Sequence, residues 1–282
     1  MHSGNGESRQ RMDARCSCNR APRRSSGFSQ TRRHRGRSCA PRFSGRSVLS
    51  AAVEQLLLPA ECLLCHALLT PRDANRIVCP LCRQRWKAVR PPWCQRCGQP
   101  EPHFGPCRLC AQWPAALRSV RSASWLEEGA RHAVHALKYG GLPRIADDLA
   151  AAMTGTRPPS DGPSALVPIP LAPKRLRERG YNQSDMLARA LARQWRIPVL
   201  ADLLVRMRET PTQTTLTPET RLANVAGAFT AGTAARWATL VLVDDVFTTG
   251  ATLAEAARAL EAAGARRLYG VTFARAAIPD FT

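Results

Sequence analysis

Segment 240–253 constrains the fold more than any other part of this chain. It opens with four aliphatic residues, Leu240 to Val243, and no polar residue interrupts them. Such a run indicates a strand that is buried on both faces, as in a parallel sheet covered by helices. A helical pattern follows at 253–260. The segment therefore predicts an α/β domain in which a strand passes through a short loop into a helix.

The loop between this strand and this helix carries polar groups that can bind a ligand. Asp244 and Asp245 stand where the aliphatic run ends. The residues that lead into the helix are Thr248, Thr249, Gly250, Ala251 and Thr252. Gly250 can adopt backbone angles closed to other residues, so successive N–H groups can point at one site. The helix start adds positive charge, and we expect a phosphate here. The alternative is an acidic turn with a threonine helix cap, which any α/β protein can contain.

The order of strand, paired carboxylates and Thr/Gly-rich loop resembles the signature of the phosphoribosyltransferase family. The resemblance implies that phosphoribosyl pyrophosphate, with magnesium, is the ligand of this domain. Asp244 and Asp245 would then bind ribose hydroxyls or a hydrated magnesium ion. Residues 248–252 would bind the phosphate of the ribose.

Four Cys-x-x-Cys pairs lie upstream of this domain. They are Cys62/Cys65, Cys79/Cys82, Cys94/Cys97 and Cys107/Cys110. Two thiolates at this spacing can bind one tetrahedral zinc ion, so the eight cysteines predict two zinc sites. A disulfide framework is the competing use of the cysteines. It is typical of small secreted domains, whereas the first residues of this chain lack the apolar core of a secretory signal.

This segment resembles the double zinc ribbon that precedes the phosphoribosyltransferase domain in ComF-type competence proteins. Sequence order suggests that the first two pairs bind one ion and the last two pairs bind the other. Cross-braced pairing also fits the spacing. Trp86, Trp93 and Trp113 lie among arginines of this segment. Their rings could stack on bases of single-stranded DNA or could form the core of a small metal domain, and the sequence favours neither.

A basic segment at 174–179 follows a candidate strand at 165–170 and leads into Gly180, Tyr181, Asn182 and Gln183. This order looks like the ComF branch of the phosphoribosyltransferases. A dense basic loop suits a leaving pyrophosphate, whose developing charge needs preorganised cations. Arg175 and Arg179 are the first candidates, because guanidinium groups bind phosphate oxygens bidentately. We expect Asn182 to cap the helix that follows.

The polar segment 206–216 resembles the mobile hood of the family. The resemblance implies that Arg206, Gln213 and Arg221 close over the bound ligand. Such a lid would keep water from the reactive ribosyl centre. Upstream, a helix predicted at 129–138 carries His132, His135 and Lys138 at helical spacing. His132 and His135 could be metal ligands, but this helical pair has no third partner, so we interpret the two histidines as a polar helix face.

The patterns divide the chain into three parts. Residues 1–47 contain twelve arginines and two acids, so they hold half of the net charge of +20, and we expect a disordered tail. Three interpretations of this tail are open: a solvated tail, a stretch that is translated only because the start codon is assigned too early, or an arm that binds nucleic acid through phosphate contacts. Residues 48–115 would form a short helix and the double zinc ribbon. Residues 116–282 would form a type I phosphoribosyltransferase domain, a parallel sheet flanked by helices with a hood.

Two functions from different classes fit the sequence. The first is a phosphoribosyltransferase, which is a type of glycosyltransferase. Asp244 and Asp245 would stabilise the cationic sugar that forms as pyrophosphate leaves. No residue specific for an acceptor is recognisable. The second follows from the resemblance to competence proteins. In this second function, the basic loops and the ribbon bind single-stranded DNA that is taken up for transformation. Competence or recombination proteins are the partners, and the nucleotide pocket serves as a sensor or a phosphate clamp.

Two further classes of function are disfavoured. A glutamine amidotransferase needs an N-terminal cysteine nucleophile, whereas His2 follows Met1 here and no glutaminase domain is present. No apolar run approaches the roughly 18 residues needed to cross a bilayer. We therefore expect a cytoplasmic protein without a membrane span.

Overall fold

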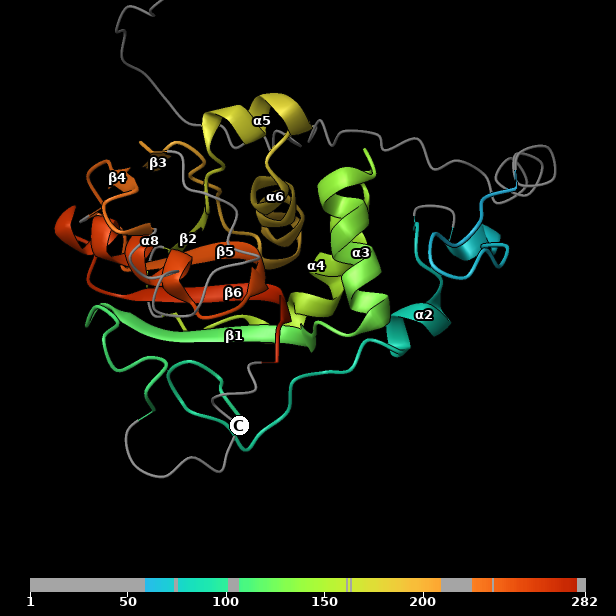
Figure 1. The fold of residues 1–282 in the computed structure, drawn as a ribbon, viewed down its shortest axis with the longest axis horizontal. Coiled ribbons are helices and arrows are strands. Elements are labelled where there is room, and N and C mark those ends of the chain that lie inside the picture. Colours follow the sequence, from blue (N-terminus) through green and yellow to red (C-terminus); the bar gives the residue numbers. More distant parts are fainter. Residues whose placement is uncertain are drawn as a thin grey trace, which may run out of the picture. The chain divides into compact units, whose positions relative to one another are not determined.

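The computed structural model describes residues 59–73, 76–100, 107–160, 162, 164–208, 225–234 and 236–277 (Figure 1). All of them belong to the compact unit Arg46–Thr282. The predicted tail 1–47, the short helix expected before Pro59, and the hood residues Gln213 and Arg221 lie outside the described residues. The predicted boundaries at 47/48 and 115/116 therefore stay predictions.

The centre of the fold is a parallel sheet of four strands in the order β1-β6-β5-β2. The strands are β1 (Leu117–Trp125), β2 (Ser164–Pro168), β5 (Thr239–Phe247) and β6 (Leu268–Arg275). Residues 239–243 of β5 are buried without a break. This confirms the interpretation of the aliphatic run as a strand covered on both faces.

Helices pack on both faces of this sheet. Val241, Val243 and Phe273 point into a core that they share with α3 (Glu128–Tyr139), α4 (Ile145–Met153) and α6 (Gln183–Trp195). Leu240 and Leu242, which alternate with them, face a second core with α8 (Ala251–Ala262). Figure 1 shows α3, α4 and α6 grouped together and α8 apart from them. The period of two along β5 thus separates the two cores.

Smaller elements complete the described part of the chain. They are η1 (Pro71–Asp73), α2 (Pro80–Gln84), η2 (Thr154–Thr156), α5 (Pro173–Arg179), β3 (Leu204–Arg206) and β4 (Phe229–Ala231). Strands β3 and β4 form a separate antiparallel pair. None of the helices in these described ranges is both long enough and apolar enough to span a membrane.

The basic segment that we predicted as a loop is helix α5. Pro173 stands at its first turn, and Gly180 ends it in the left-handed region with φ of +80°. Proline at the start and glycine just past the end are typical helix boundaries, because proline needs no N–H there and glycine tolerates positive φ. The loop interpretation was wrong, because these two boundary residues define a helix of seven residues despite its high density of positive charge.

The cysteine-rich segment packs directly against the sheet and its helices. Asp148 of α4 is buried, and its carboxylate accepts hydrogen bonds from the backbone N–H groups of Ile77 and Val78 at 2.9 and 3.1 Å. Arg275 of β6 is also buried and donates to the carbonyl of Cys97 and the side chain of Gln99, both at 2.7 Å. Buried charged groups with several partners fix the orientation of the packed segments.

The same segment covers the outer edge of the sheet. Ala88 forms an antiparallel bridge with Ser124 of β1. The N–H of Val89 donates to the carbonyl of Ala123 at 3.3 Å, and the N–H of Trp125 donates to the carbonyl of Lys87 at 2.8 Å. Strand β1 therefore has partners on both sides, β6 on one and residues 87–89 on the other.

Candidate ligand site and zinc centres

The candidate ligand site lies where β2 and β5 end. The two strands are parallel neighbours, and Pro168 lies opposite Val243. Their carboxyl ends therefore meet at the same edge of the sheet, which is where ligands bind in open α/β folds. The chain runs from β2 toward the basic helix α5 and from β5 into the loop 248–250, so cations and the candidate phosphate loop follow adjacent strands.

The acidic pair at the end of β5 is held by side chains from two helices. The carboxylate of Asp244 accepts a hydrogen bond from the hydroxyl of Ser184 at 2.9 Å. Asp245 is buried, and its Oδ2 lies 2.6 Å from Nζ of Lys138. The amide of Gln183 donates to the other oxygen of Asp245 at 3.5 Å. Residues at the end of α3 and the start of α6 thus fix both carboxylates.

The two carboxyl groups differ in acidity. Burial raises the pKa of Asp244 to about 7, the neighbouring charge of Asp245 adds to this rise, and the hydrogen bond from Ser184 opposes it. Burial acts in the same direction on Asp245, but the adjacent ammonium group of Lys138 holds the pKa of Asp245 below its usual range. Asp245 therefore stays ionised while Asp244 changes charge near neutral pH.

The loop after β5 has the conformation that the sequence predicts for it. Gly250 has φ of +78° and caps α8, and the hydroxyl oxygen of Thr249 accepts a hydrogen bond from the N–H of Ala251 at 3.4 Å. A Cβ atom on Gly250 would lie 2.6 Å from Trp113 and 2.8 Å from Phe247. The rings of Trp113 and Phe247 pack edge to face. The ribbon residue Trp113 therefore supports the back of the loop.

Two of the predicted cations, Arg179 and Arg206, interact with the acidic pair or with its neighbours. Arg179 donates to the side chain of Gln183, which links it to Asp245, and its guanidinium lies 5.1 Å from the ring of Tyr139. Burial lowers the pKa of Arg206, the positive charge of Arg175 lowers it further, and the charge of Asp244 opposes both. Arg206 is therefore within electrostatic range of Asp244 and of Arg175. Arg221 is outside the described residues.

Sequence reasoning assigned no role at this site to Lys138, Ser184 or Gln183. Lys138 was predicted only as a helix residue at the same spacing as His132 and His135, and the polar face predicted for the two histidines is indeed exposed. Asn182 caps α6 as predicted, because its side chain accepts a hydrogen bond from the N–H of Ser184 at 3.0 Å. Ser184 and Gln183 follow that cap directly, so helix capping was the signal that could have placed them near the site.

The eight cysteines form two clusters of four sulfur atoms. One contains Cys62, Cys65, Cys79 and Cys82, and the other contains Cys94, Cys97, Cys107 and Cys110. Within each cluster all sulfur atoms lie within 4.8 Å of one another, and none of the eight cysteines forms a disulfide. The grouping follows sequence order, so the cross-braced and disulfide alternatives are wrong.

Both clusters fit a tetrahedral zinc ion. The sulfur separations of 3.5 Å between Cys97 and Cys107 and 3.8 Å between Cys94 and Cys110 are close to the edge of about 3.8 Å that zinc–sulfur bonds of about 2.3 Å impose. Burial acts to raise the pKa of the Cys62 thiol, but backbone N–H donors from Cys79 and Leu64 bring it down to about 7. Such donors favour the thiolate form that binds zinc.

The three tryptophans of the ribbon have different environments. Trp86 and Trp113 are buried, and Trp86 packs edge to face on Phe273 with ring centroids 4.9 Å apart. The interpretation as base-stacking residues is therefore wrong for these two, which belong to the core. Trp93 is half-buried, and the guanidinium of Arg121 lies 5.4 Å from its ring centroid.

Comparison with known proteins gives the same architecture. A family model described as a double zinc ribbon domain matches residues 53–111, and a phosphoribosyl transferase domain model matches residues 182–278. The chain is 32% identical over 217 residues to "DNA utilization protein YhgH" of Salmonella typhimurium, covering 74% of this chain and 94% of that protein. It is 31% identical over 193 residues to "Competence protein ComFC" of Bacillus subtilis, covering 65% of this chain and 77% of that protein.

A third relative is "Competence protein F" of Haemophilus influenzae, which is 37% identical over 117 residues, or 40% of this chain and 51% of that protein. The two cysteine clusters and the parallel sheet of this chain agree with the two family models that it matches. The chain therefore belongs to the ComF family, in which a double zinc ribbon precedes a phosphoribosyltransferase domain.

Proposed function

We propose that this protein binds phosphoribosyl pyrophosphate with magnesium and transfers the phosphoribosyl group to an acceptor. The observation that supports this most is the position of Asp244 and the buried Asp245, held from two helices next to a left-handed glycine at the start of α8. Carboxylates can accept hydrogen bonds from ribose hydroxyls, and the loop with its helix start can bind the phosphate. The acceptor is not defined by the residues at the site.

Different residues of the site would bind different parts of the ligand. Asp244 and Asp245 would hold the ribose hydroxyls or a hydrated magnesium ion, and residues 248–252 would bind the ribose phosphate. Arg175, Arg179, Arg206 and Arg221 would face the pyrophosphate. Lys138 neutralises the buried Asp245, because an unpaired buried carboxylate would be unfavourable.

The reaction breaks the bond between the anomeric carbon and the pyrophosphate oxygen, and the electron pair leaves with the pyrophosphate. Positive charge develops on the ribose ring, and the two carboxylates stabilise it. A nucleophilic atom of the acceptor then bonds to the anomeric carbon and releases its proton. Magnesium, when bound, neutralises part of the charge of the pyrophosphate.

Replacing Asp244 with asparagine tests the ligand assignment. The variant keeps the size of the side chain but loses the charge that accepts ribose hydroxyls, so we expect affinity to fall by about tenfold or more. The measurement is calorimetric titration of magnesium phosphoribosyl pyrophosphate into the zinc-loaded full chain. Asp147→Asn is the matched control, because Asp147 lies on α4 in an exposed ion pair with Arg193.

Equal affinity in Asp244→Asn and wild type would contradict the assignment of Asp244. No binding by the zinc-loaded wild type would contradict the proposed ligand and would leave DNA handling as the leading function. Where binding is present, release of pyrophosphate that depends on an added acceptor distinguishes an enzyme from a sensor.

The affinity for this ligand should also depend on the protonation of Asp244. Since the pKa of Asp244 is raised to about 7, its carboxylate is protonated below that pH and affinity should rise as the pH increases through about 7. Ser184→Ala removes a hydrogen bond that lowers this pKa, so the midpoint should move to higher pH. Calorimetry over a pH series compares the two proteins. The phosphates of the ligand titrate in the same way with both proteins. Identical midpoints of affinity against pH would therefore show that Ser184 does not change the pKa of Asp244.

A role in DNA handling is the second candidate. Relatives carry the names "DNA utilization protein" and "Competence protein", and the chain has a net charge of +20. We propose that single-stranded DNA is a partner, in the cytoplasm and together with competence or recombination proteins. A salt titration of oligonucleotide binding tests this, because counterion attraction alone weakens steeply with salt for any protein this basic.

A further inference from the structure

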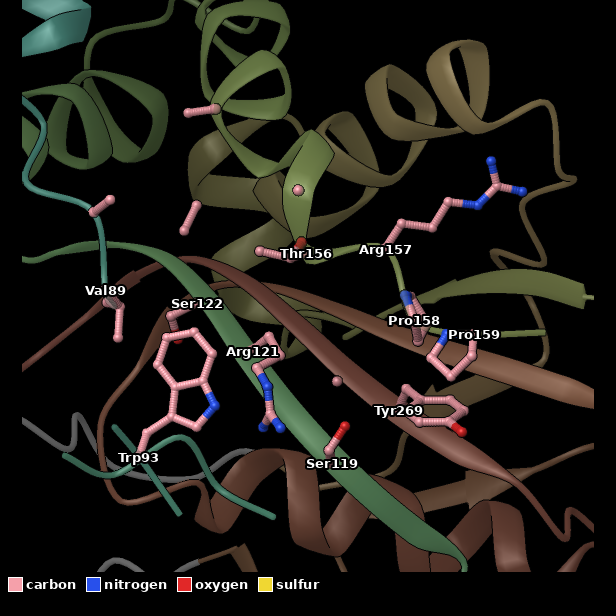
Figure 2. Close-up of a pocket in the computed structure, with 15 residues that line it drawn as sticks. Val89, Trp93, Ser119, Arg121, Ser122, Thr156, Arg157, Pro158, Pro159 and Tyr269 are labelled. Atoms are coloured by element: carbon pink, nitrogen blue, oxygen red, sulfur yellow. The ribbon is translucent and has the colours of Figure 1, made fainter. Parts of the chain in front are cut away.

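A cleft with a volume of about 430 Å³ lies at the outer edge of the sheet, away from the acidic pair. Three segments enclose it: residues 88–93 of the ribbon, residues 119–123 of β1, and the turn 155–159 after α4, while Tyr269 and Gly270 of β6 complete the lining. This volume is within the range of sites that bind small molecules. Figure 2 shows the cleft and its lining.

The cleft combines aromatic rings with a fixed guanidinium. Figure 2 shows Arg121 between Trp93 on one side and Tyr269 on the other. Arg121 donates to the carbonyls of Val120 and Gln95 at 2.9 and 2.7 Å, so its plane is held in place. An arginine has five N–H donors, and these two bonds occupy only two of them. The remaining donors of Arg121 suit a phosphate or a carbonyl oxygen.

The lining has the charge and polarity of a site for an anion that carries a flat ring. Among the described residues that line the cleft are two arginines, Arg121 and Arg157, and no aspartate or glutamate. Pro158 and Pro159 add flat apolar surface, and Ser119 adds a hydroxyl group. Base stacking on a tryptophan beside a cationic group is the chemistry by which proteins hold single nucleotides of a strand.

We propose that this cleft binds a nucleotide, with the base against Trp93 and the phosphate at Arg121. The nucleotide is either a free mononucleotide or one unit of single-stranded DNA, since both present the same base and phosphate. The cleft is separate from the candidate ligand site at Asp244 and Asp245, which do not line it. The proposal for the cleft holds whether or not the candidate ligand site binds phosphoribosyl pyrophosphate, because the two sites share no residue that the structure describes.

Two titrations of the zinc-loaded full chain distinguish the two sources. Thymidine monophosphate serves as the free nucleotide, and a short oligothymidylate serves as the strand. Trp93→Ala should weaken binding of the probe that occupies the cleft by about fivefold or more, because the base loses the ring on which it stacks. Trp237→Ala is the matched control, because Trp237 is also half-buried with an arginine guanidinium 5.4 Å from its ring centroid, but it does not line the cleft. Trp93→Phe should restore most of the affinity.

The pattern of losses decides the outcome. Loss of monophosphate binding in Trp93→Ala supports a free nucleotide, and loss confined to the oligonucleotide supports a base within a strand. Equal binding of both probes by Trp93→Ala and Trp237→Ala would overturn the proposal. A measurement on the wild-type protein does not depend on the folding of the variants. An oligonucleotide that contains bromouracil is photocrosslinked to the protein, and mass spectrometry should find the crosslinks in residues 88–93 or 119–123. Crosslinks only elsewhere would overturn the proposal as well.

Discussion

Replacement of Cys97 by serine should reduce the zinc content from two ions to one and should loosen the loop that begins at Thr248. Cys97 is fully buried in the second cluster, and its carbonyl accepts the hydrogen bond from Arg275. Structural zinc supplies about 10–16 kcal/mol of apparent folding free energy in small zinc domains at neutral pH. Loss of this ion should therefore unfold the ribbon around Trp113, which supports Gly250.

Metal analysis measures the first effect and hydrogen–deuterium exchange of residues 248–252 measures the second. Cys65→Ser is the control, because Cys65 is an exposed member of the first cluster. It should also release one zinc ion, but the exchange of residues 248–252 should stay as in wild type. Faster exchange in both variants, or in neither, would mean that the second zinc does not specifically support the loop. Two zinc ions retained in Cys97→Ser would contradict the assignment of the cluster.

Gly250→Ala should destabilise the protein by about 3 kcal/mol and should abolish ligand binding at the loop. Two effects combine. A side chain in the left-handed region costs about 1–2 kcal/mol, and forcing a methyl group into a packed site costs about 1–3 kcal/mol. The second applies here because the new Cβ atom would meet Trp113 and Phe247 at 2.6 and 2.8 Å. Chemical denaturation measures the stability.

Gly141→Ala isolates the backbone effect. Gly141 also has positive φ, +62°, but a Cβ atom there would have nothing within 4 Å. Its replacement should cost only about 1–2 kcal/mol. If the two substitutions destabilise the protein equally, the contact between the loop and the ribbon is too soft to constrain the loop. The difference between the two variants therefore reports on the support that Trp113 gives to the loop.

Local sequence predicts the parts of this fold that depend on neighbours in the chain. An uninterrupted aliphatic run can be stable only when both faces are covered, so β5 was predictable. Cys-x-x-Cys spacing predicts which two sulfur atoms bind one ion together, whereas the combination of pairs into clusters follows from the fold. Asn182 was predictable for the same reason, because a helix cap acts within two residues of its partner.

Contacts between distant segments were not predictable in this way. Lys138 approaches Asp245 only because α3 ends at the edge of the sheet where β5 ends, and no pattern within α3 distinguishes it from the exposed His132 and His135. The same holds for the tryptophans. Trp86 and Trp113 are buried by Phe273 and Phe247, which lie far along the chain, while Trp93 is left at a cleft.

The bridge between Ala88 and Ser124 has a consequence for association between molecules. The uncovered edge of a sheet is a template on which a strand from another molecule can add, and natural proteins block such edges. Residues 87–89 pair with residues 123–125 at the end of β1, so the cysteine-rich segment blocks this part of the edge against a strand from another molecule. A domain produced without it would expose a nine-residue strand and would tend to polymerise edge to edge.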